Sequence, residues 1–84
     1  MSTITATRTA EGFTVQVDGI VVATKRGKRP LANSFIAVPA WSLRSAYGIA
    51  FVSSATREGA IKSYRRNEWH KTPGSENPII VPII

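Results

Sequence analysis

The stretch that most directly predicts the fold is Phe13-Thr14-Val15-Gln16-Val17-Asp18-Gly19-Ile20-Val21-Val22. Asp-Gly between two alternating apolar segments is the strongest short-range sign of a two-residue β-hairpin, because both turn positions must tolerate a positive φ angle. Such a turn fixes the strand pairing, and the expected pairs are Val17–Ile20, Val15–Val22 and Phe13–Thr24. We therefore expect one apolar face made of Phe13, Val15, Val17, Ile20 and Val22.

Weaker signals predict further strands on both sides of this hairpin. Residues 3–9 alternate in polarity and indicate an earlier strand. Residues 34–43 are apolar but contain Pro39, which predicts a bulged or edge strand. Residues 47–53 predict another strand, with a hairpin loop at 44–46 between the two.

One helix is predicted over about residues 56–69. Thr56 is a suitable N-cap and Glu58 lies in the first turn, where the helix dipole favours an anion. Pro73-Gly74 would end the helix firmly. The expected fold is α+β, an antiparallel sheet of three to five strands with this helix packed on one face. The expected core consists of Phe13, Val15, Val17, Ile20, Val22, Ile49, Phe51, Ile61 and Tyr64.

The size and composition favour one small soluble domain. Its 84 residues are 43% hydrophobic, and there is no cysteine, which excludes a disulfide scaffold and a thiolate metal site. No segment resembles a signal peptide or reaches the roughly 20 apolar residues of a membrane span, so we expect a cytoplasmic protein with no membrane contact. We expect the domain to cover residues 1–84, with a core at about 3–71 and an extended apolar tail at 78–84.

The residues give little basis for catalysis. His70 is the single histidine, and the five acidic residues form no pair at helical spacing for a metal or a shared proton. No nucleophile elbow and no glycine-rich phosphate loop occurs. We therefore expect a protein that is not an enzyme and that has no cofactor.

Basic residues point to a polyanionic partner. The net charge is +6, and most of the basic side chains fall into two clusters. The first cluster is a loop with Lys25, Arg26, Lys28 and Arg29. The second lies along the helix, where Lys62, Arg65, Arg66 and Trp69 share one face and Trp69 is placed to stack on a base. The alternative is that both clusters are solvated surfaces and that Trp69 packs in the core.

The C-terminal segment Pro78-Ile79-Ile80-Val81-Pro82-Ile83-Ile84 is unusually apolar. Its prolines forbid a helix and a central strand, so it is expected to be extended or an edge strand. It either covers the core of its own domain or packs on a second subunit. The second alternative makes Ile79, Ile80, Val81, Ile83 and Ile84 candidate residues for self-association.

Residues 41–61 lead into Phe51-Val52-Ser53-Ser54-Ala55-Thr56-Arg57-Glu58-Gly59-Ala60-Ile61. This layout resembles short uncharacterised proteins of bacteriophages and their hosts, which share a Trp-strand-turn-strand-Thr-Arg-Glu-x-Ala order. More loosely, it is similar to the three-stranded DNA-binding domain of tyrosine recombinases and AP2-type factors, from which it departs at Gly59 and in lacking arginines on the strand face. The first resemblance implies a phage or mobile-element accessory protein, with host-factor inhibition and DNA binding as common roles. The second implies a sheet that enters the major groove.

Three functional hypotheses follow from these observations. The first is a nucleic-acid-binding module that uses the two basic clusters. The second is a phage-type accessory protein that binds and inhibits or redirects an acidic host protein. The third is an assembly component that forms homo-oligomers through the apolar tail.

Overall fold

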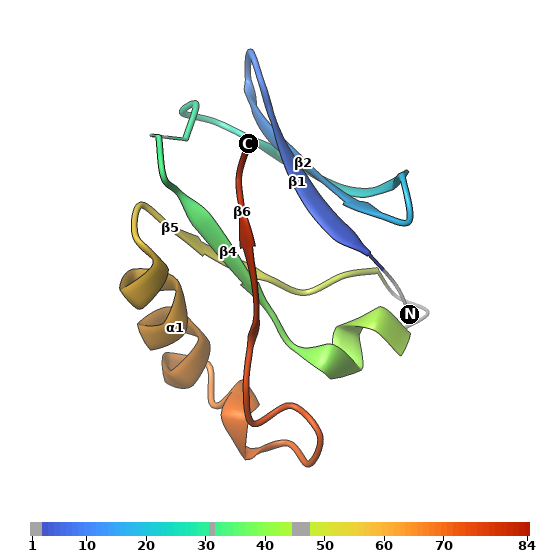
Figure 1. The fold of residues 1–84 in the computed structure, drawn as a ribbon, viewed down its shortest axis with the longest axis vertical. Coiled ribbons are helices and arrows are strands. Elements are labelled where there is room, and N and C mark those ends of the chain that lie inside the picture. The colour runs from blue at the N-terminus through green and yellow to red at the C-terminus, as the bar shows by residue number, and fades with distance from the viewer. Residues whose placement is uncertain (1–2, 31, 45–47) are drawn as a thin grey trace.

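The computed structural model describes residues 3–30, 32–44 and 48–84. In this part of the chain the strands form two three-stranded antiparallel sheets, and one α-helix lies in the C-terminal half (Figure 1). The predicted α+β class is therefore confirmed, with the strands divided between two sheets instead of one. The elements are β1 (Ile4–Thr9), β2 (Gly12–Val17), β3 (Ile20–Arg26), β4 (Phe35–Val38), the 3-10 helix η1 (Ala40–Arg44), β5 (Val52–Ser54), α1 (Arg57–Arg66), the 3-10 helix η2 (Trp69–Lys71) and β6 (Ile79–Pro82).

The first sheet, in the order β1-β2-β3, contains the predicted hairpin with a different register. The turn residues Asp18 and Gly19 have positive φ angles of 53° and 83°. Beyond the turn a β-bulge leaves Val22 unpaired, so that the pairs along the hairpin become Val17–Ile20, Gln16–Val21, Val15–Ala23, Thr14–Thr24 and Phe13–Lys25. The predicted pairs Val15–Val22 and Phe13–Thr24 are wrong because this one extra residue reverses the face of every later side chain on β3.

The bulge also changes which residues of β3 reach the core. Ala23 stands opposite buried Val15 and is partly buried, whereas Ile20 and Val22 are 69% and 40% exposed. The prediction that Ile20 and Val22 belong to the core is therefore wrong. Phe13, Val15 and Tyr64 are buried as expected, and the remaining predicted core residues are partly buried: Val17, Ile49, Phe51 and Ile61.

The second sheet has the order β5-β4-β6, so β4 is a central strand. The prediction of a bulged or edge strand is wrong, because β4 ends at Val38 and Pro39 lies outside the ladder. Three of the four β4 residues are fully buried, which matches a strand covered on both faces. The loop expected at 44–46 and the start of the strand expected at 47–53 fall mostly on residues 45–47, which lie outside the described part of the chain. The strand prediction is wrong over residues 48–51, since the strand described there, β5, begins only at Val52.

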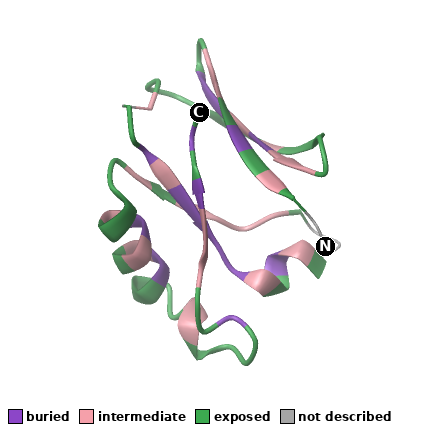
Figure 2. Cartoon of the chain, viewed as in Figure 1, coloured by how far each residue is buried: buried purple, intermediate pink, exposed green. Residues whose placement is uncertain are grey.

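The apolar tail forms β6 and closes the core of its own chain. It pairs with β4 and meets β1 through a parallel bridge between Ala6 and Ile83. The backbone N–H of Ile84 donates to the carbonyl of Ala6 at 2.9 Å. Ala6, Val15 and Ile83 thus belong to one core cluster packed between the two sheets, whose buried residues are visible in Figure 2.

Helix α1 packs on the opposite face of the second sheet. Thr56 caps it as predicted, with its hydroxyl oxygen accepting from the backbone N–H of Gly59 at 3.0 Å. The helix ends at Arg66, earlier than expected, because the Asn67 side chain donates to the carbonyl of Ser63 and Glu68 adopts a left-handed φ of 61°. Trp69 therefore lies in η2, outside the α-helix.

A second buried cluster lies between α1 and the sheet. It contains Ala37, Ala60 and Tyr64, and the Tyr64 hydroxyl donates to the backbone carbonyl of Ser75. Burial, and to a lesser degree the nearby Glu76 carboxylate, raises the pKa of Tyr64 above its usual 10.0. Among the described residues, no helix is both long and apolar enough to cross a membrane.

Candidate functional site

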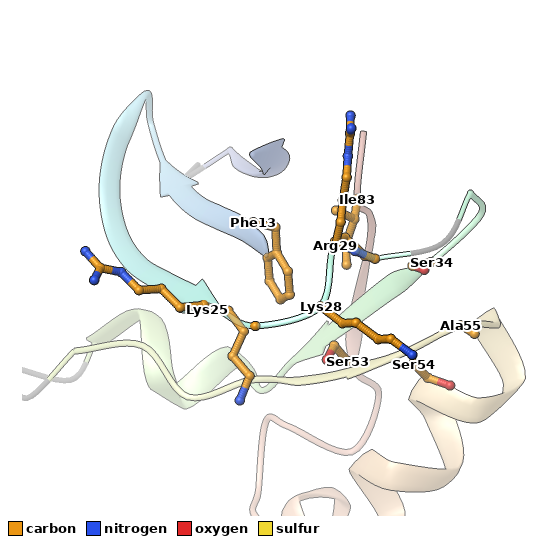
Figure 3. Close-up of a pocket in the computed structure, with 12 residues that line it drawn as sticks. Phe13, Lys25, Lys28, Arg29, Ser34, Ser53, Ser54, Ala55 and Ile83 are labelled. Carbon is orange, nitrogen blue, oxygen red and sulfur yellow. The ribbon is translucent and has the colours of Figure 1, made fainter. Parts of the chain in front are cut away.

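A cavity of about 310 Å³ lies between the segment that follows β3 and the segment that leads into α1 (Figure 3). We call it the basic cleft. Two buried side chains, Phe13 of β2 and Ile83 directly after β6, contribute to its lining. The described residues that line it are Phe13, Lys25, Arg26, Gly27, Lys28, Arg29, Pro30, Ser34, Ser53, Ser54, Ala55 and Ile83.

The β-bulge determines the orientation of Lys25. Because Lys25 stands directly opposite Phe13 in the ladder, both side chains are on the face of the sheet that looks toward the core. In the regular hairpin predicted from the sequence, Thr24 would occupy this position. The unpaired Val22 therefore brings a cation to the cleft instead of a threonine.

Two glycine contacts fix the backbone of this wall. A Cβ atom on Gly12, whose φ is +149°, would lie 2.0 Å from the carbonyl oxygen of Lys25, so only glycine permits β2 to approach β3 this closely. The backbone N–H of Gly27 donates to the carbonyl of Glu11 at 2.7 Å. These contacts hold residues 25–27 against the β1–β2 turn.

The opposite wall is formed by residues 53–55, directly before α1. The hydroxyl oxygen of Ser54 accepts from the backbone N–H of Thr56 at 3.4 Å. A Cβ atom on Gly59 would lie 2.1 Å from this hydroxyl oxygen. The glycine that weakens the helix by about 1 kcal/mol relative to alanine therefore permits the first turn of α1 to pack against this wall.

All charged side chains in the described lining of the cleft are positive. Four basic residues line it, and none of its described lining residues is acidic. The ion pair between Lys71 and Glu68, at 3.4 Å, lies outside the cleft. Figure 3 shows Lys25 and Lys28 extending toward the β5 side, whereas Arg29 extends away from it. The positive charge of the two lysines is thus directed across the cavity and is available to an anion.

The basic residues of the helix lie elsewhere. Lys62, Arg65 and Arg66 are exposed, and none of them lines the cleft. Arg57 lies two residues after the cleft wall, whereas Arg65 lies eight residues further along the helix, an axial distance of about 12 Å. The structure therefore joins the first predicted cluster into one site and leaves the second cluster on a separate surface.

Trp69 packs among aromatic side chains. Its ring lies edge-on to Tyr64 at 5.6 Å and to Trp41 at 6.1 Å between centroids, and it is partly buried. This is the packing alternative that the sequence left open for Trp69. The ring is engaged by two neighbours and stands on a different element from Arg65 and Arg66.

The described residues contain no group of three or more His, Cys, Asp or Glu side chains that is arranged to hold a metal ion. The lining residues that sequence reasoning did not assign to a site are Phe13, Gly27, Pro30, Ser34, Ser53, Ser54 and Ala55, and Ile83 was predicted only for self-association. No local pattern marks the lining as a group, because residues 13, 25–30, 34, 53–55 and 83 are five separate segments that meet only in the folded chain.

Comparison of this chain with models of known protein families, with curated proteins and with solved structures found no match. The resemblance of residues 41–61 to phage accessory proteins and to the recombinase-type domain therefore stays a prediction.

Proposed function

We propose that this protein binds nucleic acid and that the basic cleft is its contact surface. The observation that carries the proposal is the gathering of Lys25, Arg26, Lys28 and Arg29 around one cavity whose described lining contains no carboxylate. Phosphate groups are the most abundant anions that such a surface meets along a polymer, and Lys and Arg supply most contacts to them. The described lining holds basic side chains and no carboxylate to pair with them in a reaction, which favours a binding role.

The number of cations sets the expected dependence on salt. Neutralising four phosphates gives a log–log slope of about −3.6 on duplex DNA and about −2.8 on a single strand. Between 50 and 200 mM salt, these slopes correspond to losses of affinity of roughly 150-fold and 50-fold.

The test is fluorescence anisotropy with labelled single- and double-stranded DNA and RNA at 50 and 200 mM salt. Lys25→Ala/Lys28→Ala is compared with the control Lys62→Ala/Arg65→Ala, which removes the same charge from the other basic surface. We expect the cleft variant to reduce the salt slope by close to two phosphate contacts and the control variant to leave it nearly unchanged. Absence of binding at 50 mM salt, or equal losses in both variants, would contradict the proposal.

A second candidate function is supported by a different surface. Strand β3 is an edge of the first sheet, and Ile20 and Val21 are 69% and 55% exposed on it. Exposed edge strands with β-branched residues are templates for strand addition by another protein. This favours the accessory-protein hypothesis, in which an acidic host protein adds a strand beside β3 and contacts Lys25 and Arg26. Capture of such a partner by the wild-type protein and not by Val21→Pro would support it, because proline removes a backbone donor from the edge.

Self-association through the tail stays a prediction for Ile79, Ile80, Val81, Ile83 and Ile84. Since Val81 and Ile83 are buried in the core of their own chain, truncation at Asn77 would remove part of that core. Ile84 is exposed, so Ile84→Asp is the cleaner test. A dimer by size-exclusion chromatography with light scattering that Ile84→Asp converts to a monomer would support assembly.

A further inference from the structure

We infer that the basic cleft receives one unpaired base, so that the protein selects single-stranded nucleic acid over a duplex. This inference rests on the proposed function and specifies its ligand. It is drawn from the volume of the cavity, the chemistry of its lining and the direction of one lysine.

The cavity is small and largely open to solvent. A volume of about 310 Å³ lies at the lower end of the range for pockets that enclose small organic molecules. In a duplex the bases are paired and stacked, and their phosphates form a continuous outer ridge. A flexible single strand can turn a base outward into a protein pocket without the energy of unpairing. The small volume of the cleft therefore fits a single base better than a duplex.

The lining combines an apolar surface with hydroxyl groups. Phe13 and Ile83, which are only 4% and 3% exposed, form the apolar floor of the cleft, and Phe13 lies edge-on to Phe51 with 5.8 Å between ring centroids. Ser53, on the opposite wall of the cleft, is exposed. A hydroxyl both donates and accepts hydrogen bonds, so it can pair with the edge of any of the bases. Such a lining recognises a base with little preference for sequence.

Lys25 lies where it can contact the phosphate of a base that is bound in the cleft. Cations on a purely solvated hairpin end would point away from the core, whereas Lys25 stands on the core-facing side directly opposite Phe13. Lys28 extends toward Ser54 on the other wall (Figure 3). A base that contacts Phe13 would therefore place its own phosphate and that of its neighbour near these two ammonium groups.

The experiment fills the cavity without changing any charge. Ser53→Phe places a ring in the cleft, and Thr24→Phe, on the outer face of β3, is the matched control. The probes are a labelled 12-nucleotide single strand of mixed sequence and the same sequence as a duplex, both at 50 mM salt.

Contact of one base with an aromatic protein surface changes affinity by about five- to 150-fold. We expect the single strand to bind the wild-type protein about tenfold more tightly than the duplex.

We expect Ser53→Phe to lose about tenfold in affinity for the single strand and to bind the duplex as the wild type does. Thr24→Phe should bind both probes as the wild type does. Equal wild-type affinity for both probes, or single-strand binding unaffected by Ser53→Phe, would overturn the inference and leave the proposed function in place. Failure of both probes to bind would instead contradict the proposed function itself.

Circular dichroism checks that each variant is folded. Ala55→Phe, from a second exposed position in the lining, replaces Ser53→Phe if that variant does not fold. A competition arm adds thymidine monophosphate or inorganic phosphate to the bound single strand. We expect the nucleotide to displace the strand at a lower concentration than phosphate, and equal displacement by the two would count against a site for the base.

Discussion

The hydrogen bond from the Tyr64 hydroxyl to the carbonyl of Ser75 provides a quantitative test of the fold. Tyr64 is fully buried and Ser75 is 1% exposed, so water has no access to replace the donor. Tyr64→Phe removes the hydroxyl and leaves a buried carbonyl without this partner, at a cost of about 1–3 kcal/mol. For 84 residues the total free energy of unfolding is expected to be about 4–13 kcal/mol, so this loss is a large fraction of it.

The assay is urea unfolding followed by tryptophan fluorescence. Trp69 lies 5.6 Å from Tyr64 and Trp41 lies 6.1 Å from Trp69, measured between ring centroids, so the emission reports this cluster directly. With an m-value of about 1 kcal/mol/M, the midpoint should fall by about 1–3 M urea. Thr7→Val is the control, since it removes an exposed hydroxyl whose 3.3 Å hydrogen bond to Gln16 should contribute less than about 0.5 kcal/mol. A Tyr64→Phe midpoint that matches this control would refute the reasoning.

Three further predictions concern backbone, pH and surface. Gly12→Ala should destabilise the protein by roughly 2–4 kcal/mol in urea titrations, because the added methyl group displaces the Lys25 carbonyl. The same displacement should weaken nucleic-acid binding. Stability close to the wild type would show that β2 and β3 do not approach this closely. Since the folded-state pKa of Tyr64 is raised, its contribution is complete below pH 10.0 and is lost as the pH rises through the raised value. Thermal melts from pH 8 to 11 should therefore show a steeper loss in the wild type than in Tyr64→Phe, and parallel curves would disprove this assignment. Val21→Lys should change stability by less than about 0.5 kcal/mol and raise the concentration at which light scattering detects association; a large loss of stability would mean that Val21 is packed.

The hairpin illustrates how far local sequence signals reach. Asp18-Gly19 predicts the turn because the backbone there needs positive φ angles, and the structure has them. The bulge at Val22, three residues after Gly19, has no such signal, since Val21, Val22 and Ala23 are all apolar and either register places apolar residues inside. The observed register packs Ala23 against the core cluster and sets Lys25 opposite Phe13, a tertiary arrangement that local alternation does not contain.

The helix shows the same division between local and tertiary information. Thr56 is visible as an N-cap in the sequence and acts as one. The helix end depends on the Asn67 side chain and on a left-handed Glu68, a conformation that glutamate adopts only when its surroundings impose it. The packing of Trp69 against Tyr64 and Trp41 supplies those surroundings.

Half of the candidate site was accessible from the sequence. The four cations in residues 25–29 are adjacent in the chain, so charge counting identifies them. Their partners across the cavity, Ser53 and Ile83, become neighbours only when β5 and β6 flank β4. A site assembled over such distances along the chain is a property of the fold and leaves no local motif.

The unpaired Val22 also bears on how this chain tolerates changes in length during evolution. Loss of this one residue would convert β3 into a regular strand while preserving each existing pair, from Val17–Ile20 through Phe13–Lys25. Because Val21 is also a valine, its loss gives the same chain and the same regular pairing. The bulge therefore lets β3 lose a codon at Val21 or Val22 while the cation that faces the cleft stays in place.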